Sequence, residues 1–98
     1  MKKLLSVLFI ILCSCFFISC GANPKDQRPT FTVGMECAYA PFNWTENVKS
    51  DTNYPIEGTQ FYAEGYDVQI SKIIADRLGY RLVIKKIDWD GLIAALES

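Results

Sequence analysis

The segment DVQISKIIADRLG, residues 67–79, has the helical periodicity that decides the fold class of this chain. Its large apolar side chains recur at the spacing of one helical face; they are Ile70, Ile73, Ile74 and Leu78. Gly79 stands where the left-handed residue that follows a helix is usually found. The sequence therefore predicts a helix over residues 67–78 that buries this apolar face, with Asp67 as its cap.

Predicted strands flank this helix on both sides. Residues 31–36 contain FTVGM, a β-rich run in which apolar and polar residues alternate. Residues 81–87, RLVIKKI, follow the helix directly and place Leu82 and Ile84 on one face of a strand. Because a single helix separates the two strands, they should lie parallel in one sheet, with a right-handed crossover between them.

A second helix is expected to begin at Gly91, where either Asp88 or Asp90 can cap the first turn. The buried side of this helix would carry three apolar residues, which are Leu92, Ile93 and Leu96. Strands and helices then alternate along the chain in the order β-α-β-α. That order is typical of the α/β class with a parallel sheet.

Two segments without helical periodicity lie between the first strand and the first helix. Residues 37–44 are expected to form a loop. Residues 45–64 are a long polar excursion that is expected to be irregular or to form a small hairpin. Asp51 and Asn53 have the spacing of calcium-loop ligands, but Ile56 occupies the position where such a loop requires glycine, so no calcium site is expected.

The expected topology locates a candidate binding site. In open α/β sheets, ligands bind beyond the carboxyl ends of the strands. The segments at that edge are residues 36–44 and 88–91, and the candidate rim residues within them are Glu36, Tyr39, Phe42, Trp44 and Trp89. Phe42 is expected to belong to the core rather than to contact a ligand. For Trp44 two roles stay open, packing within the loop and contact with the ligand.

The amino-terminal region has the pattern of a secretory signal peptide. Lys2 and Lys3 precede an uncharged apolar run over residues 4–18, and small residues follow that run. A helix of that length reaches only about 22 Å, which is short of the roughly 30 Å hydrocarbon core of a bilayer. A signal peptide over residues 1–19 is therefore favoured over a transmembrane helix.

The end of this region, FISC at residues 17–20, resembles the bacterial lipobox, in which a small residue precedes a cysteine that becomes lipidated. The resemblance implies cleavage before Cys20 and attachment of that cysteine to the membrane through acyl chains. A competing match, LCSC at residues 12–15, would shorten the apolar run and is disfavoured. Residues 20–30 are polar and contain two prolines, so they are expected to be the lipidated cysteine and a flexible tether.

The cysteine and histidine content limits the chemistry of the chain. Of its four cysteines, Cys13 and Cys15 leave with the signal and Cys20 is lipidated, so no intramolecular disulfide is expected. The remaining Cys37 is expected to be a small buried residue. Because the chain has no histidine and no visible nucleophile–base pair, no metal site, no cofactor and no catalytic residue are predicted.

Length and charge exclude further classes. A chain of 98 residues allows at most one small domain. Lys and Arg together number 10 and Asp and Glu number 11; removal of Lys2 and Lys3 with the signal leaves a net charge of −3. The basic residues are scattered along the sequence, so no nucleic-acid-binding surface is expected.

Three sequence blocks carry a family resemblance. They are VGMECAYAPF at 33–42, GYDV at 65–68 and IDWDGLIAAL at 87–96. Together they resemble the start of family 3 bacterial extracellular solute-binding proteins, the polar amino acid receptors of ABC importers. The resemblance implies a periplasmic-binding-protein type 2 fold, in which two α/β lobes close on one amino acid. It also implies that residues 31–98 are an incomplete N-terminal part of the first lobe.

The resemblance also implies a ligand, partners and a location. Glu36 would contact the side chain of a polar or basic amino acid, or of cystine, while Tyr39 and Trp89 would line its apolar stem. Trp44 is a fourth candidate. An arginine and an acid after residue 98 would bind the ligand's α-carboxylate and α-amine. The partners would be ABC permease subunits, and the lipid-anchored chain would be extracytoplasmic, on the periplasmic side or the outer cell surface. The same fold serves sensor proteins and periplasmic enzymes, namely a dehydratase and a lytic transglycosylase, so these alternatives stay open.

Overall fold

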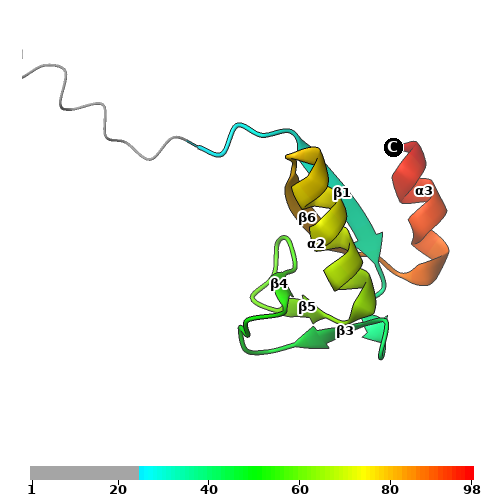
Figure 1. Cartoon of the computed structure of the whole chain (residues 1–98). Helices are drawn as coiled ribbons and strands as arrows, with labels where there is room; N and C mark the ends of the chain where they lie inside the picture. Colours follow the sequence, from blue (N-terminus) through cyan, green and yellow to red (C-terminus); the bar gives the residue numbers. More distant parts are fainter. Residues whose placement is uncertain (1–24) are drawn as a thin grey trace, which may run out of the picture.

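A computed structural model describes residues 25–98 of the chain (Figure 1). The predicted signal peptide and Cys20 lie outside these residues. The described part mixes helices with parallel and antiparallel strands, which confirms the α/β class. Within it, no helix is long and apolar enough to cross a membrane.

The two predicted parallel strands form one sheet. They are β1 (Thr30–Met35) and β6 (Arg81–Lys86), and their register runs from Thr30 opposite Arg81 to Met35 opposite Lys86. Helix α2 (Tyr66–Leu78) connects them and lies against this sheet (Figure 1). The parallel pairing is confirmed, and the observed ends of both strands and of the helix differ by at most one residue from those predicted.

A second, antiparallel sheet occupies most of the segment between β1 and α2. Its strand order is β2 (Ala38–Tyr39), β3 (Asn43–Glu46), β5 (Tyr62–Glu64) and β4 (Tyr54–Pro55). The expected small hairpin is present as the pair β4–β5. The excursion is otherwise more ordered than expected, because β3 and β5 also pair across it.

The excursion contributes a central core residue. Ile56 is 1% exposed and forms a parallel bridge to Ile84, whose carbonyl accepts a 2.8 Å hydrogen bond from the Glu57 N–H. The core therefore joins both sheets and α2; its buried members are Met35, Cys37, Ile56, Ala63, Val68, Ala75, Leu82 and Ile84.

The buried face of α2 differs from the predicted one. The residues that α2 buries are Val68, Ser71 and Ala75. The four apolar residues predicted to be buried are 38–53% exposed; they are Ile70, Ile73, Ile74 and Leu78. Small side chains let the helix axis approach the sheet closely, so the sheet is covered by the small-residue face and the larger apolar residues remain at the surface.

The N-cap of α2 is a glycine rather than the predicted Asp67. Gly65 is the N-cap residue, and no side chain caps the helix. The first N–H groups of the helix are instead bound by loop carbonyls, because Tyr66 donates to Pro41 (3.2 Å) and Asp67 donates to Phe42 (2.8 Å). The loop after β1 thereby accepts the hydrogen bonds of the free N–H groups at the helix start, which the side chain of Asp67 was expected to accept. The opposite end is as predicted, with Gly79 in the left-handed conformation.

The second helix is present but is shorter and less buried than predicted. A 3₁₀ turn (Trp89–Gly91) precedes α3 (Leu92–Glu97), and neither Asp88 nor Asp90 makes a side-chain cap bond. Of the three apolar residues expected on its buried side, only Leu92 is partly buried, lying over Gly34 of β1. Ile93 and Leu96 are 68% and 84% exposed. Leu96 lines a pocket of about 500 Å³ between α3 and the β1–β6 sheet instead of packing against the strands. Figure 1 shows α3 on the other side of β1 from α2.

Candidate functional site

The carboxyl ends of β1 and β6 lie side by side. Met35 is opposite Lys86, and the Ile87 N–H extends the ladder with a 3.0 Å bond to the Met35 carbonyl. Glu36 and Trp89 therefore leave neighbouring strands at the same sheet edge, as the predicted topology requires. The Glu36 side chain is partly buried, and that of Trp89 is 71% exposed.

Tyr39 and Phe42 form a stacked aromatic pair beside this edge. Their ring centroids are 5.3 Å apart with planes inclined at 28°. A turn produces the stack, since the Phe42 N–H donates to the Tyr39 carbonyl at 2.9 Å. The expectation that Phe42 belongs to the core is wrong, because the turn directs its ring onto Tyr39 and leaves it 43% exposed.

Trp44 lies on a different face from Tyr39. In the β2–β3 ladder, Tyr39 is opposite Asn43 and Trp44 is opposite Ala38. Residues directly opposite share a face, and neighbours along a strand alternate between faces. Trp44 is partly buried, and its indole Nε1–H donates to a Glu46 carboxylate oxygen at 2.7 Å. The structure thus groups Tyr39 with Phe42 and directs Trp44 to the other side of the ladder.

Cys37 is buried beneath the rim, as predicted. It is 2% exposed and has a positive φ of 55°. Burial raises the pKa of its thiol, while Lys86 acts weakly in the opposite direction. The thiol therefore stays protonated at neutral pH, a form that is a poor nucleophile.

Asn43 and Thr45 are polar residues of the site that were not predicted from the sequence. The Asn43 side chain is 7% exposed, accepts a 2.7 Å bond from the Cys37 N–H and donates a 2.9 Å bond to the Asp67 carboxylate. The role of Asp67 is therefore to bind this amide rather than to cap α2. A signal was available in the sequence, since Asn43 and Thr45 place two polar side chains on one face of a short strand.

Glu64 links the excursion to the start of α2. Burial alone would raise the pKa of its carboxyl, but hydrogen bonds from the Thr52 hydroxyl, the Gly65 N–H and the Ser50 hydroxyl outweigh burial and lower it. The bond from Thr52 measures 2.7 Å and that from Gly65 3.0 Å. The ionised carboxylate therefore joins the polar excursion to Gly65, the residue before α2.

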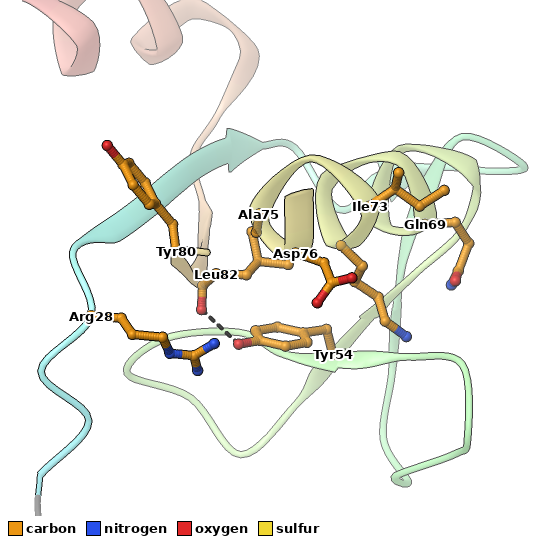
Figure 2. A pocket seen from close by; sticks show the side chains of 9 residues that line it. Arg28, Tyr54, Gln69, Ile73, Ala75, Asp76, Tyr80 and Leu82 are labelled. Carbon is orange, nitrogen blue, oxygen red and sulfur yellow. Dashed lines mark hydrogen bonds between the residues drawn. The ribbon is translucent and has the colours of Figure 1, made fainter. Parts of the chain in front are cut away.

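A pocket of about 450 Å³ lies at the opposite end of the β1–β6 sheet (Figure 2). Tyr54 lines it and donates a 2.6 Å bond to the carbonyl of Leu82, near the start of β6. Arg28, before β1, also lines the pocket; it pairs with Asp26 at 2.6 Å and lowers the pKa of that carboxyl to about 2. The pocket is therefore separate from the rim at the carboxyl ends of the strands. Within residues 25–98, no group of three or more acidic or cysteine side chains could hold a metal ion.

Comparison with known proteins identifies relatives that are named for amino acid binding. The chain is 31% identical to the L-cystine-binding protein TcyA of Bacillus subtilis, over all of this chain and 38% of that protein. It is 27% identical to a probable amino-acid ABC transporter-binding protein of Haemophilus influenzae, over 79% of this chain and 25% of that protein. It is 26% identical to the arginine-binding extracellular protein ArtP of Bacillus subtilis, over all of this chain and 34% of that protein.

These relatives are much longer than the chain. The chain spans between a quarter and two fifths of the length of the three proteins described. No family model matches the chain. No solved structure matches it either. The chain is thus similar, over a part of their length, to bacterial extracellular and transporter-associated proteins that bind amino acids, and these are binding proteins rather than enzymes.

Proposed function

We propose that this chain carries the first part of an extracytoplasmic receptor that delivers a polar or basic amino acid, or cystine, to an ABC importer. The observation that carries the proposal is the arrangement of Glu36 and Trp89 at the end of two paired parallel strands. The relatives named for cystine, arginine and amino-acid ABC transport support the same ligand class.

The chemistry of the rim suits such a ligand. An amino acid with a polar or cationic side chain needs an opposing charge and flat apolar surfaces, and aromatic faces also attract cations. Glu36 provides the carboxylate. The Tyr39–Phe42 stack and the exposed indole of Trp89 provide aromatic surface that the core does not use.

We further propose that residues 31–98 are the N-terminal part of lobe 1 of a two-lobed fold. Large apolar side chains exposed in groups favour a further partner surface. Such groups are present on α2 and α3; they are Ile70, Ile73, Ile74 and Leu78, and Ile93 and Leu96. In this proposal the rest of the fold covers them and supplies the cationic and acidic groups that bind the α-carboxylate and α-amine.

Cys20 is proposed as the lipid anchor. Mass spectrometry of membrane-extracted protein should show a diacylglyceryl-modified peptide that begins at Cys20, and Cys20→Ala should abolish it. The matched control is Cys15→Ala, which should leave the modified peptide intact because Cys15 is removed with the signal. Recovery of an unmodified mature protein that begins after residue 22 would contradict the anchor.

The ligand is tested by calorimetric titration of the twenty amino acids and cystine. The protein is made from the complete reading frame of its gene, without residues 1–20 so that it stays in aqueous solution. We expect one polar or basic amino acid, or cystine, to bind. Tight binding of only a sugar, a metal ion or a long peptide would contradict the proposal.

Glu36→Ala should weaken binding of a basic ligand by roughly 1.5–3 kcal/mol, because a charge-assisted bond is lost. Asp76→Ala is the matched control. Asp76 is an exposed acid that lines the pocket at the opposite end of the sheet, so its removal should leave the affinity unchanged. Equal affinities for the two variants would show that Glu36 does not contact the ligand.

A further inference from the structure

Asn43 is a buried amide between the rim loop and helix α2. Its Oδ1 atom accepts a 2.7 Å bond from the Cys37 N–H, and its Nδ2 atom donates a 2.9 Å bond to the Asp67 carboxylate. Only 7% of Asn43 is exposed, so water cannot readily replace either partner. One side chain therefore connects the loop that carries Glu36 and Tyr39 to the first turn of α2.

Thr45 binds the same loop residue as Asn43. The two residues are two positions apart in β3, so their side chains lie on one face of the strand. The Thr45 hydroxyl donates a 2.8 Å bond to the Cys37 carbonyl. Both backbone polar groups of Cys37 are thus bound by β3 side chains, and we call Asn43 and Thr45 the Cys37 clamp.

The clamp acts on an unusual backbone conformation. Cys37 has a φ of 55°, in the left-handed region that residues with a Cβ seldom adopt. Such a conformation persists only when surrounding contacts fix it. Glu36 precedes this residue and Tyr39 follows it closely, so the φ of Cys37 determines how the carboxylate and the aromatic ring are placed relative to each other.

We propose that Asn43 is a positioning residue for the amino acid ligand, acting through Cys37 on Glu36 and Tyr39. Asp67 fixes which way the Asn43 amide points, because a carboxylate can only accept a hydrogen bond and so faces the NH₂ group. The Asn43 oxygen is then directed at the Cys37 N–H. This inference rests on the proposed function of the rim, and the structure of the clamp itself can be tested without any ligand.

The first test compares two buried asparagines in the protein made from the complete reading frame without residues 1–20. Asn43→Ala should raise the ligand Kd about tenfold and speed exchange of the Cys37 amide hydrogen by a similar factor. Asn53→Ala is the matched control. Asn53 is 8% exposed, and its amide bonds the Ser50 N–H and the Val48 carbonyl, so its loss should lower stability but leave the Kd and the Cys37 exchange rate unchanged.

The second test is a rescue. Asn43→Asp places two carboxylates against each other and should weaken ligand binding as Asn43→Ala does. Adding Asp67→Asn restores an amide–carboxylate pair with donor and acceptor exchanged, and leaves an oxygen at position 43 for the Cys37 N–H. The double variant should regain most of the lost affinity. A residue that contributed only to stability would not restore the Kd in this way.

Two results would overturn the inference. One is a protein that binds its amino acid and keeps its Kd within about a factor of two in Asn43→Ala. The other is a Cys37 amide that exchanges at the same rate in Asn43→Ala and Asn53→Ala, which would show that Asn43 does not hold the loop. If the unaltered protein binds no amino acid at all, the proposed function fails. The Cys37 amide exchange rates of Asn43→Ala and Asn53→Ala then still show whether Asn43 holds the loop.

Discussion

Gly65→Ala should destabilise the protein by about 3 to 5 kcal/mol. A Cβ atom at this position would lie 2.5 Å from the Phe42 carbonyl oxygen and 3.0 Å from that of Pro41. Those two carbonyls bind the first N–H groups of α2, so they cannot move away without breaking the helix start. Gly65 also has φ 126° and ψ −177°, a conformation that is essentially restricted to glycine.

Gly58→Ala separates the steric effect from the conformational one. Gly58 also has a positive φ, 74°, but no atom lies within 4 Å of a Cβ built there. Its substitution should cost only about 1 to 2 kcal/mol, the ordinary cost of a left-handed residue with a Cβ. Urea unfolding of both variants measures the difference, and equal losses would show that the contact with Phe42 does not constrain the helix start.

The close contact of Gly65 with the loop accounts for the glycine in GYDV, one of the sequence blocks that carry the family resemblance. The sequence predicts a helix over residues 67–78 with Asp67, the third residue of this block, as its cap. In the structure each member has a separate role, since Gly65 allows the close approach of the loop, Asp67 binds Asn43, and Val68 is fully buried. The helix itself was predictable because periodicity and Gly79 are local signals. The partner of Asp67 was not, because it lies 24 positions away along the chain.

The face that α2 buries shows another limit of periodicity. Ile70 and its apolar neighbours give the strongest helical pattern, yet the sheet is covered by Val68, Ser71 and Ala75. A helix with small residues on one side and large apolar residues on another has two surfaces that can pack, and periodicity alone does not rank them. The distance between the helix axis and the sheet decides which face is buried, because the face with small residues permits the closest approach.

The rim was partly predictable for a topological reason. The β-α-β order requires parallel strands, so the residues that follow them must meet at one edge, and Glu36 and Trp89 do so. The sequence places Trp44 and Tyr39 in the same rim segment, residues 36–44, and leaves open whether Trp44 packs within the loop or contacts the ligand. The short antiparallel ladder between them directs neighbouring side chains to opposite faces, and strands of two to four residues are too short to show a periodic pattern.

Ile56→Ala should destabilise the protein by about 2 to 5 kcal/mol, the usual range for truncation of a buried isoleucine. Ile56 is 1% exposed, and Ile84, to which it bridges, is completely buried, so the cavity would open at the centre of the core. This large effect is expected from a segment whose sequence is polar and loop-like.

Val48→Ala is the matched control for Ile56→Ala. Val48 belongs to the same excursion, is also β-branched and is 76% exposed, so its truncation should change the free energy of unfolding by less than about 0.5 kcal/mol. Urea unfolding of the two variants compares them directly. A large loss for Ile56 alone would mean that the excursion is an integral part of the core, because Ile56 joins β6 to the antiparallel sheet. Similar small losses for both variants would instead mean that the excursion is a surface loop, and that β1, α2 and β6 form the core without it.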